Sequence, residues 1–385
     1  MSVRQQMRTA LCGVALTGIV LTTAQGLAVA APAPGGGAKA SPGAGAVAAA
    51  EDDAARSLAR SLADTAWRAE VDRAAAGGGE LGLKALAARS GARAAGPLAA
   101  DVAAADRAVL AAKGLDAGTG GLLTVALAGD ADPRRAPLVA VAPSDDGATA
   151  VTAYDTAGRR HTLDAAKAPD VPVYVVGVDG EKAVEAGMEV LERELAAAGV
   201  STAEVPAAGT AGRPAATATA TTTGYWTSRI TSVRLEDDKE TWIKGDAEIF
   251  SIVSGFGLDG KVRVDTVTHP YLDDAGTTYH PNQILVNWSQ YKYNLADVVM
   301  MEDDGGTDYS ALAKAMAAAL LTIADLGAYI PLVDPVVDAL PSSFWTDDAD
   351  FVDAWYTLAR ETTGARDGAG GNGRFTLDRY WVQAL

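Results

Sequence analysis

The feature that most constrains the fold is the segment 201–223, STAEVPAAGTAGRPAATATATTT, which separates two halves of different composition. It contains one valine and no larger apolar side chain, so it cannot bury enough surface to fold by itself. Helical and strand patterns alternate before it, whereas six of the seven tryptophans follow it. We therefore predict a flexible Ala/Thr/Pro-rich linker between two domains, the number that a length of 385 residues favours.

The first thirty residues have the pattern of a secretory signal peptide. Arg4 and Arg8 give a basic start, an apolar stretch covers 9–24, and a small-x-small cleavage site ends at Ala30. We predict a secreted bacterial protein that is cleaved after Ala30 and has no transmembrane segment in its mature chain. The only cysteine, Cys12, lies inside this peptide, which leaves the mature chain without disulfides or thiolate ligands.

The net charge limits the possible partners. The formal charge is −17 and the sequence pI is about 4.6. A field of this sign repels phosphate backbones and anionic membranes, so nucleic acid is excluded as a first hypothesis. Apolar residues make up 49% of the chain and charged residues 21%, which is enough for a sizeable core. The expected partner is an extracellular ligand of unknown identity, and the oligomeric state is open.

The first half indicates an α+β domain over 51–200. The Pro/Gly/Ala-rich stretch 31–50 predicts a disordered lead, and helical periodicity begins at Glu51. Apolar strand-like runs follow, of which 171–178 is apolar on both faces, as in a central strand. The segment 181–199, EKAVEAGMEVLERELAAAG, predicts an amphipathic helix that ends at its glycine.

The second half, 224–385, indicates a mainly-β domain. Strand patterns of six to ten residues alternate with acidic turns, and antiparallel strands of this kind commonly form a sandwich. One long helix is inserted, predicted over 307–327 from TDYSALAKAMAAALLTIADLG. The segments ADFVDAWYTLA and RFTLDRYWVQAL are predicted as closing strands.

Acidic turns of the second half are candidate calcium sites. Calcium takes six to eight oxygen ligands, and adjacent carboxylates repel one another unless water or a cation lies beside them. The candidate calcium ligands are Asp238, Asp246, Asp303, Asp304 and Asp308, with Asp273 and Asp274 as weaker candidates. The alternative is structural: Thr307 or Asp308 could cap the following helix, with the neighbouring carboxylates at its positive end.

Two resemblances bear on the second half and on the whole chain. The strand and acidic-loop pairs SVRLEDDKETWIKGDAEIFSIV and ADVVMMEDDGGTDYSAL resemble a C2 domain, in which two aspartate-bearing loops hold calcium. A C2 domain has no long helix directly after the second loop, so this chain departs from that pattern. The segments DDKETWIKGDAEIF, PYLDDAGTTYHPNQILVNWSQYKY and MEDDGGTDYSALAKAM resemble a family of secreted bacterial proteins of unknown function, over residues 51–385.

Other chemistries leave weaker patterns. His269 and His280 flank one turn and could bind zinc together with Asp273 or Asp274, but no spacing rule singles them out, so ordinary loop histidines are the favoured interpretation. Loop carboxylates could also serve a secreted hydrolase, since glycoside hydrolysis uses a pair of them. We therefore expect a non-catalytic, calcium-dependent binding module, with a secreted hydrolase and purely structural acidic loops as the alternatives. In a third possibility the first domain is a pro-segment, removed by cleavage in the linker.

Overall fold

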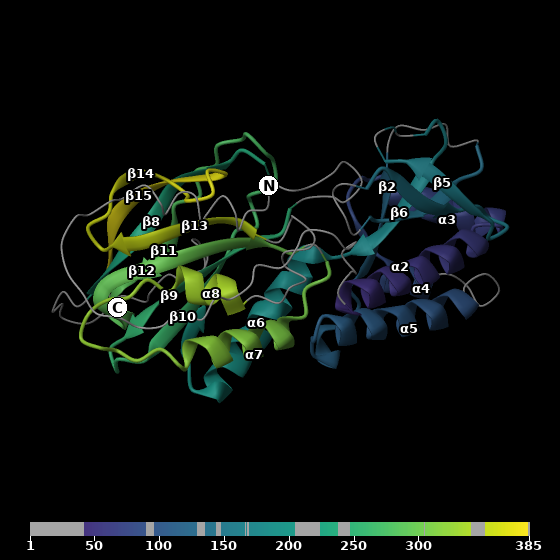
Figure 1. Ribbon diagram of the computed structural model, residues 1–385. Coiled ribbons are helices and arrows are strands. Elements are labelled where there is room, and N and C mark those ends of the chain that lie inside the picture. The colour runs from purple at the N-terminus through teal and green to yellow at the C-terminus, as the bar shows by residue number, and fades with distance from the viewer. Residues whose placement is uncertain are drawn as a thin grey trace, which may run out of the picture.

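The computed structural model describes residues 42–89, 96–128, 135–143, 148–165, 167, 169–204, 224–237, 247–303, 305–339 and 351–383. It has two lobes joined side by side (Figure 1). One lobe holds a six-stranded sheet with helices, and the other holds two further sheets with helices packed on one of them. The predicted fold class, an α+β half followed by a mainly-β sandwich-like half, is confirmed.

The first lobe is a mixed sheet with helices on one side. Its strand order is β1-β2-β6-β3-β4-β5, antiparallel except for the parallel pair β3 and β6. The helices are α2 (Pro42–Ser61), α3 (Thr65–Ala75), α4 (Leu83–Arg89) and α5 (Gly96–Ala112). The strands are β1 (Leu81–Gly82), β2 (Leu123–Ala128), β3 (Leu138–Val141), β4 (Ala150–Tyr154), β5 (Arg160–Asp164) and β6 (Val173–Val178).

The second lobe has three layers. A five-stranded sheet, β13-β12-β9-β10-β7, packs with one face on a four-stranded sheet, β11-β8-β15-β14, and with the other on helices. The elements are α6 (Gly180–Ala198), β7 (Ser201–Glu204), β8 (Gly224–Leu235), β9 (Ile249–Gly257), β10 (Val262–Thr268), β11 (Gln283–Asn287), β12 (Tyr291–Glu302), α7 (Tyr309–Leu320), α8 (Val333–Ala339), β13 (Phe351–Ala359), β14 (Gly364–Asp367) and β15 (Gly373–Gln383).

Alternation along β9 shows why this strand is buried throughout. Successive side chains of a strand point to opposite faces. Phe250 and Ile252 belong to the core cluster on the helix side, whereas Ile249 and Val253 belong to the cluster between the two sheets. All nine residues of β9 are buried, as expected for the central strand of a three-layer lobe.

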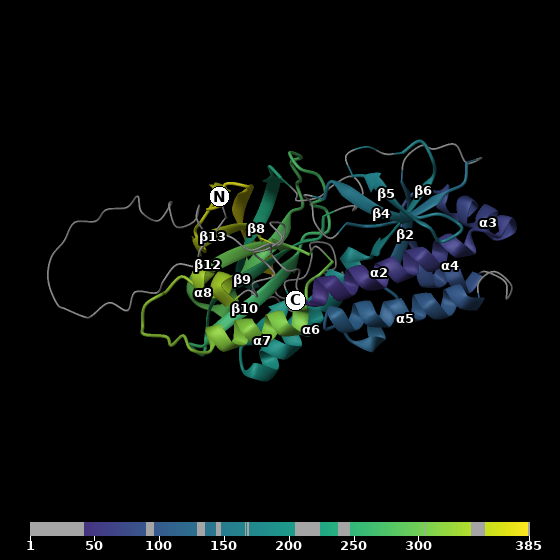
Figure 2. The ribbon, with the colours of Figure 1, turned by 45° about the vertical axis from the view of Figure 1, so that its right-hand side comes forward.

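The helix-side core runs through both lobes. It contains Leu58 of α2, Val176 of β6, Leu191 of α6, Phe250 of β9 and Leu312 of α7. The helices α6 and α7 lie side by side in two views of the molecule (Figure 2) and contact each other extensively. The helix α6 follows the last strand of the first sheet and packs on the second lobe, so it joins the two.

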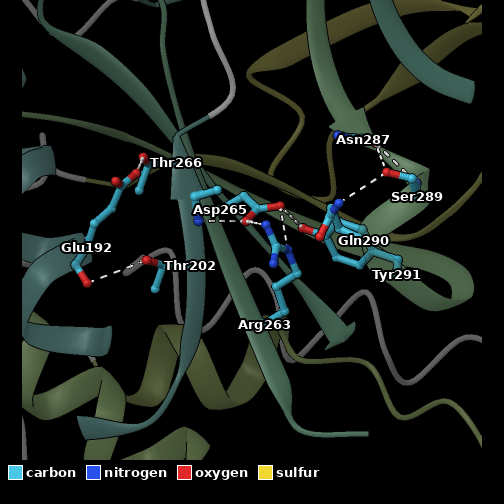
Figure 3. A network of polar contacts seen from close by, with 10 residues as sticks. Glu192, Thr202, Arg263, Asp265, Thr266, Asn287, Ser289, Gln290 and Tyr291 are labelled. Atoms are coloured by element: carbon cyan, nitrogen blue, oxygen red, sulfur yellow. Dashed lines mark hydrogen bonds and ion pairs between the residues drawn. The ribbon is translucent and has the colours of Figure 1, made fainter. Parts of the chain in front are cut away.

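Polar contacts support the pairing of β7 with β10 at the edge of the five-stranded sheet. The carboxylate of Asp265, on β10, accepts hydrogen bonds from Arg263 Nε at 3.0 Å, Tyr291 Oη at 2.9 Å and the Ala203 amide at 3.0 Å (Figure 3). Burial raises the pKa of Asp265, and the charge of Arg263 opposes this rise. The parallel pairing of β7 with β10 is thus supported by a buried, fully engaged carboxylate.

Three predicted boundaries need correction. The lead predicted as disordered over 31–50 is helical from Pro42 onward, because Val47 and Ala50 are buried in the core, while 31–41 lies outside the described residues. The linker predicted over 201–223 begins with β7, whose main chain pairs with β10; residues 205–223 lie outside the described part. The inserted helix is shorter than predicted and ends at Leu320.

Candidate ligand cavity between the lobes

A cavity of about 750 Å³ lies where the first sheet, α6 and the second lobe meet. Thr124, Ala126 and Ala128 of β2 and Val175 and Gly177 of β6 line it on the sheet face opposite the helices. Helix α6 lines a second side. The third side comes from the second lobe, through Ala247, Glu248, Ile249, Thr268, Pro270 and Asp273.

Small side chains leave space for the cavity on this face of the sheet. Leu123 and Val125 of β2 point into the helix-side core, so the alternate residues, two alanines and a threonine, face the cavity. Gly180 holds the cavity wall close to the second lobe. A Cβ at this position would lie 2.0 Å from Cδ of Glu248, so any larger residue would require the Glu248 side chain to move.

Helix α6 supplies half of the carboxylates that line the cavity. Glu181, Glu185 and Glu189 recur every four residues, which puts them on one face of the helix, and all three are exposed and line the cavity. Asp179 caps the helix by accepting a hydrogen bond from the Lys182 amide at 3.1 Å. Glu192 continues the same wall, and its Oε1 accepts a hydrogen bond from Thr266 Oγ1 at 2.6 Å (Figure 3).

The charge of the cavity is one-sided. The residues that line it include eight carboxylates and, within the described chain, no lysine or arginine: Glu80, Asp179, Glu181, Glu185, Glu189, Glu192, Glu248 and Asp273. No described residue forms an ion pair or hydrogen bond with the side chains of Glu181, Glu185 or Glu189. Like charges at this spacing repel one another, and a bound cation would relieve that repulsion.

The predicted calcium ligands are not gathered at one place among the described residues. Asp273 lines the cavity, whereas the neighbouring Asp274 accepts a hydrogen bond from Tyr279 Oη at 3.2 Å in the turn. Asp238, Asp246 and Asp304 lie outside the described residues. In the described part of the chain no three histidine or carboxylate side chains are grouped to hold a metal ion.

Asp303 forms a buried ion pair that joins the lobes. Lys113 Nζ lies 3.0 and 2.9 Å from its two carboxylate oxygens, and Tyr309 Oη donates to one of them at 2.7 Å. Both side chains of the pair are fully buried. Burial raises the pKa of Asp303, but the charge and hydrogen bonds of Lys113 outweigh it, so the pKa lies below its usual value. Lys113 therefore supplies the counter-charge that was expected from calcium.

Asp308 caps α7, as the structural alternative predicted. Its Oδ1 accepts a hydrogen bond from the Ala311 amide at 3.0 Å, and its backbone is extended, as at an N-cap. The cap also lies against the first lobe. A Cβ on Gly114 would come within 2.5 Å of Asp308 Oδ1, so the turn after α5 and the start of α7 are in close contact.

The suggested zinc site is wrong, because its two histidines do not meet. His269 is fully buried, with Nε2 2.8 Å from Ser251 Oγ and Nδ1 2.9 Å from Gln283 Oε1. His280 is exposed, and its Nδ1 lies 3.1 Å from the Thr231 carbonyl oxygen. Burial lowers the pKa of His269 to about 4, so this histidine is neutral at pH 7. The buried Ser251–His269 contact is out of reach of a substrate.

Sequence reasoning missed the acidic face of α6. The pattern Glu181, Glu185, Glu189 was visible within a helix that was interpreted only as amphipathic. The spacing of the glutamates could not show that they line a cavity. That depends on a tertiary contact, because α6 leaves the first sheet and packs on α7. The four-residue recurrence of glutamates beside the apolar face was the available signal.

No described helix combines the length and apolar character needed to cross a membrane. No curated protein matches this chain, and no solved structure matches it. A family model matches residues 55–384, nearly the whole chain after the predicted lead. The chain belongs to the family described as "Protein of unknown function (DUF3103)".

Proposed function

We propose that this protein is a non-catalytic binding module that holds a cation-bearing ligand in the cavity between its lobes. One observation carries the proposal: Glu181, Glu185 and Glu189, which have no described partner, line a cavity of about 750 Å³ that no basic residue of the described chain lines. Cavities of roughly 300 to 1,000 Å³ are the usual size for ligand sites in proteins. Export to the cell exterior, which the first thirty residues predict, would expose the cavity to extracellular ligands.

The lining favours an organic cation over a bare metal ion. Alanines 126, 128 and 142, Val175 and Met188 give apolar contact surface, and the carboxylates stand around it. A ligand with a hydrocarbon body and amino or guanidino groups matches both parts of this lining. Its charged groups would replace water beside the glutamates of α6, where the effective dielectric constant is lower than in bulk water.

Calcium dependence of ligand binding is a separate part of the proposal. Asp273 and Glu248 line the cavity, and calcium prefers carboxylate oxygens. An ordering role of calcium predicts that chelation lowers the affinity for the organic cation. A secreted hydrolase acting through these carboxylates predicts turnover of a glycoside, ester or peptide substrate.

Ligand binding to the full chain without its signal peptide tests the proposal. Spermine is the probe, and a neutral polyether of similar length is the control, each titrated by calorimetry and by melting temperature with calcium or with chelator. Preferential binding to the folded state stabilises it by mass action and so raises the melting temperature. The added free energy of unfolding is about 2.7 kcal/mol at a free ligand concentration one hundred times Kd. Absence of spermine binding under both conditions contradicts the proposal.

Matched variants locate the binding. Glu185→Gln combined with Glu189→Gln removes two charges from the cavity wall and is expected to weaken spermine binding at least tenfold. Glu194→Gln is the control, because Glu194 lies on the same helix but does not line the cavity. A loss in Glu194→Gln about half as large in free energy as that in the double variant, one charge against two, would mean that spermine responds only to the net charge of the protein.

A further inference from the structure

One edge of the first sheet borders the cavity without a complete partner strand. Strand β2 pairs with β6 over its whole length, Leu123 to Ala128. On its other side β1 pairs only with Thr124 and Val125, through Gly82 and Leu81. The remaining residues of β2 have no second partner strand among the described residues. The cavity extends around this edge, because Gly79 and Glu80 line it together with Leu127.

Two glycines turn the chain away from this edge. Gly78 and Gly79 have φ values of 72° and 80°, in the left-handed region that favours glycine. Continued antiparallel pairing would bring Gly79 opposite Leu127, two residues beyond the Leu81–Val125 pair. The left-handed backbone at Gly79 ends β1 instead, so β1 does not extend to the position beside Leu127.

Main-chain alternation decides which groups face the open edge. The Asp179 amide donates to the Leu122 carbonyl at 2.7 Å, so even-numbered residues of β2 turn their N–H and C=O groups toward β6. Odd-numbered residues turn theirs the other way. The Leu123 amide donates to Asp106 Oδ1 at 2.9 Å, and Val125 lies opposite β1. Leu127 directs its N–H and C=O to the edge beside the cavity, and it is 37% exposed.

We infer that the cavity receives a basic segment of an extended polypeptide, which adds as a short strand to β2 at Leu127. This inference rests on the proposed function and names its ligand class. An incoming strand would exchange main-chain hydrogen bonds with Leu127, and its lysine or arginine side chains would lie among the carboxylates of the cavity. Charge complementarity selects this occupant, since a second copy of a chain with a net charge of −17 would be repelled.

Three peptides test strand addition on the full chain without its signal peptide. The parent is a fluorescein-labelled heptapeptide of alternating lysine and valine, and two twins are N-methylated at its odd or its even positions. Each N-methylated peptide keeps the charge and side chains of the parent but loses the N–H donors along one edge of the peptide strand. Fluorescence anisotropy is expected to show the parent bound and one twin weakened about tenfold or more.

The outcomes separate this inference from the proposed function. If both twins bind as tightly as the parent, or if spermine binds and the parent does not, strand addition is overturned while the cation site stands. If neither spermine nor the parent binds, both proposals fall. A second line uses Leu127→Pro, which removes the edge N–H, against Leu127→Val, which keeps it. A tenfold weaker parent peptide in the proline variant alone supports the inference, and equal affinity in two folded variants contradicts it.

Discussion

Carboxylates occur in two contrasting settings in this protein. In the buried setting the carboxylate of Asp303 has its own donors, Lys113 and Tyr309. Asp353 is fully buried as well, and its oxygens accept main-chain hydrogen bonds from the amides of Ala354, Gly370, Asn372 and Gly373. In the cavity, by contrast, three glutamates of α6 repeat along one face without a described counter-charge.

The difference shows that the negative charge of the chain has two distinct roles. A buried charge is tolerated only when hydrogen bonds or an opposite charge compensate for lost hydration, and in Asp303 and Asp353 these contacts also hold segments together. Glu181, Glu185 and Glu189 have no such partner among the described residues, and they repel one another in the free protein. A positively charged ligand would relieve that repulsion, which is the reason for proposing it there.

Loss of the charge partner of Asp303 is expected to have the largest effect. Lys113→Met leaves a buried carboxylate without its counter-charge, so the free energy of unfolding should fall by about 3 to 5 kcal/mol. Urea denaturation measures this change. The control is Arg193→Met, which breaks the exposed pair with Asp116 and should cost about 1 kcal/mol or less. Similar losses in the two variants would remove the distinction between buried and exposed charges.

Acid should destabilise the protein through a second buried group, His269. Its pKa is lowered to about 4 in the folded protein and returns to 6.5 on unfolding. The unfolded state therefore binds more protons below pH 6.5, and stability should fall between pH 6.5 and 4 by about 3 kcal/mol, at 1.36 kcal/mol per pKa unit.

Urea denaturation at several pH values checks this, with His269→Gln expected to flatten that part of the curve. His280→Gln should keep the slope, because His280 is exposed. A curve for His269→Gln that is as steep as that of the native protein would contradict the assignment.

The helix cap at Asp308 should give a smaller effect. Asp308→Ala removes the acceptor for the Ala311 amide and should lower the free energy of unfolding by about 1 kcal/mol, whereas Asp308→Asn should restore most of it. Melting curves with calcium and with chelator distinguish the cap from a metal ligand. A loss in Asp308→Asn that appears only with calcium would support calcium coordination by this residue.

The smallest predicted effect has the opposite sign. Glu185→Gln removes repulsion with Glu181 and Glu189, so the ligand-free protein should become more stable by a few tenths of a kcal/mol per relieved pair. Glu194→Gln should give no such gain, because the positions four residues before and after it are apolar, Val190 and Ala198. Destabilisation by Glu185→Gln would show that this glutamate has a structural partner after all.

Sequence patterns predicted much of the fold and little of the site. Period-two alternation and apolar runs placed β6, β9 and β12, and the Asp308 cap was recognisable from its position before a helical pattern. The start of α2 was missed, because a Pro/Gly/Ala-rich stretch has few side chains that signal burial. Lys113 and Asp303 are 190 residues apart, so nothing local connected them.

By itself the sequence determined the order of helices and strands, the excess of negative charge and the division into an α+β half and a strand-rich half. These properties follow from local periodicity and composition, which every segment carries with it. Tertiary structure alone decided which carboxylates lie in the core and which surround the cavity. Burial depends on the packing of distant segments, here α6 against the second lobe, and the hydration of a charge is set by that packing.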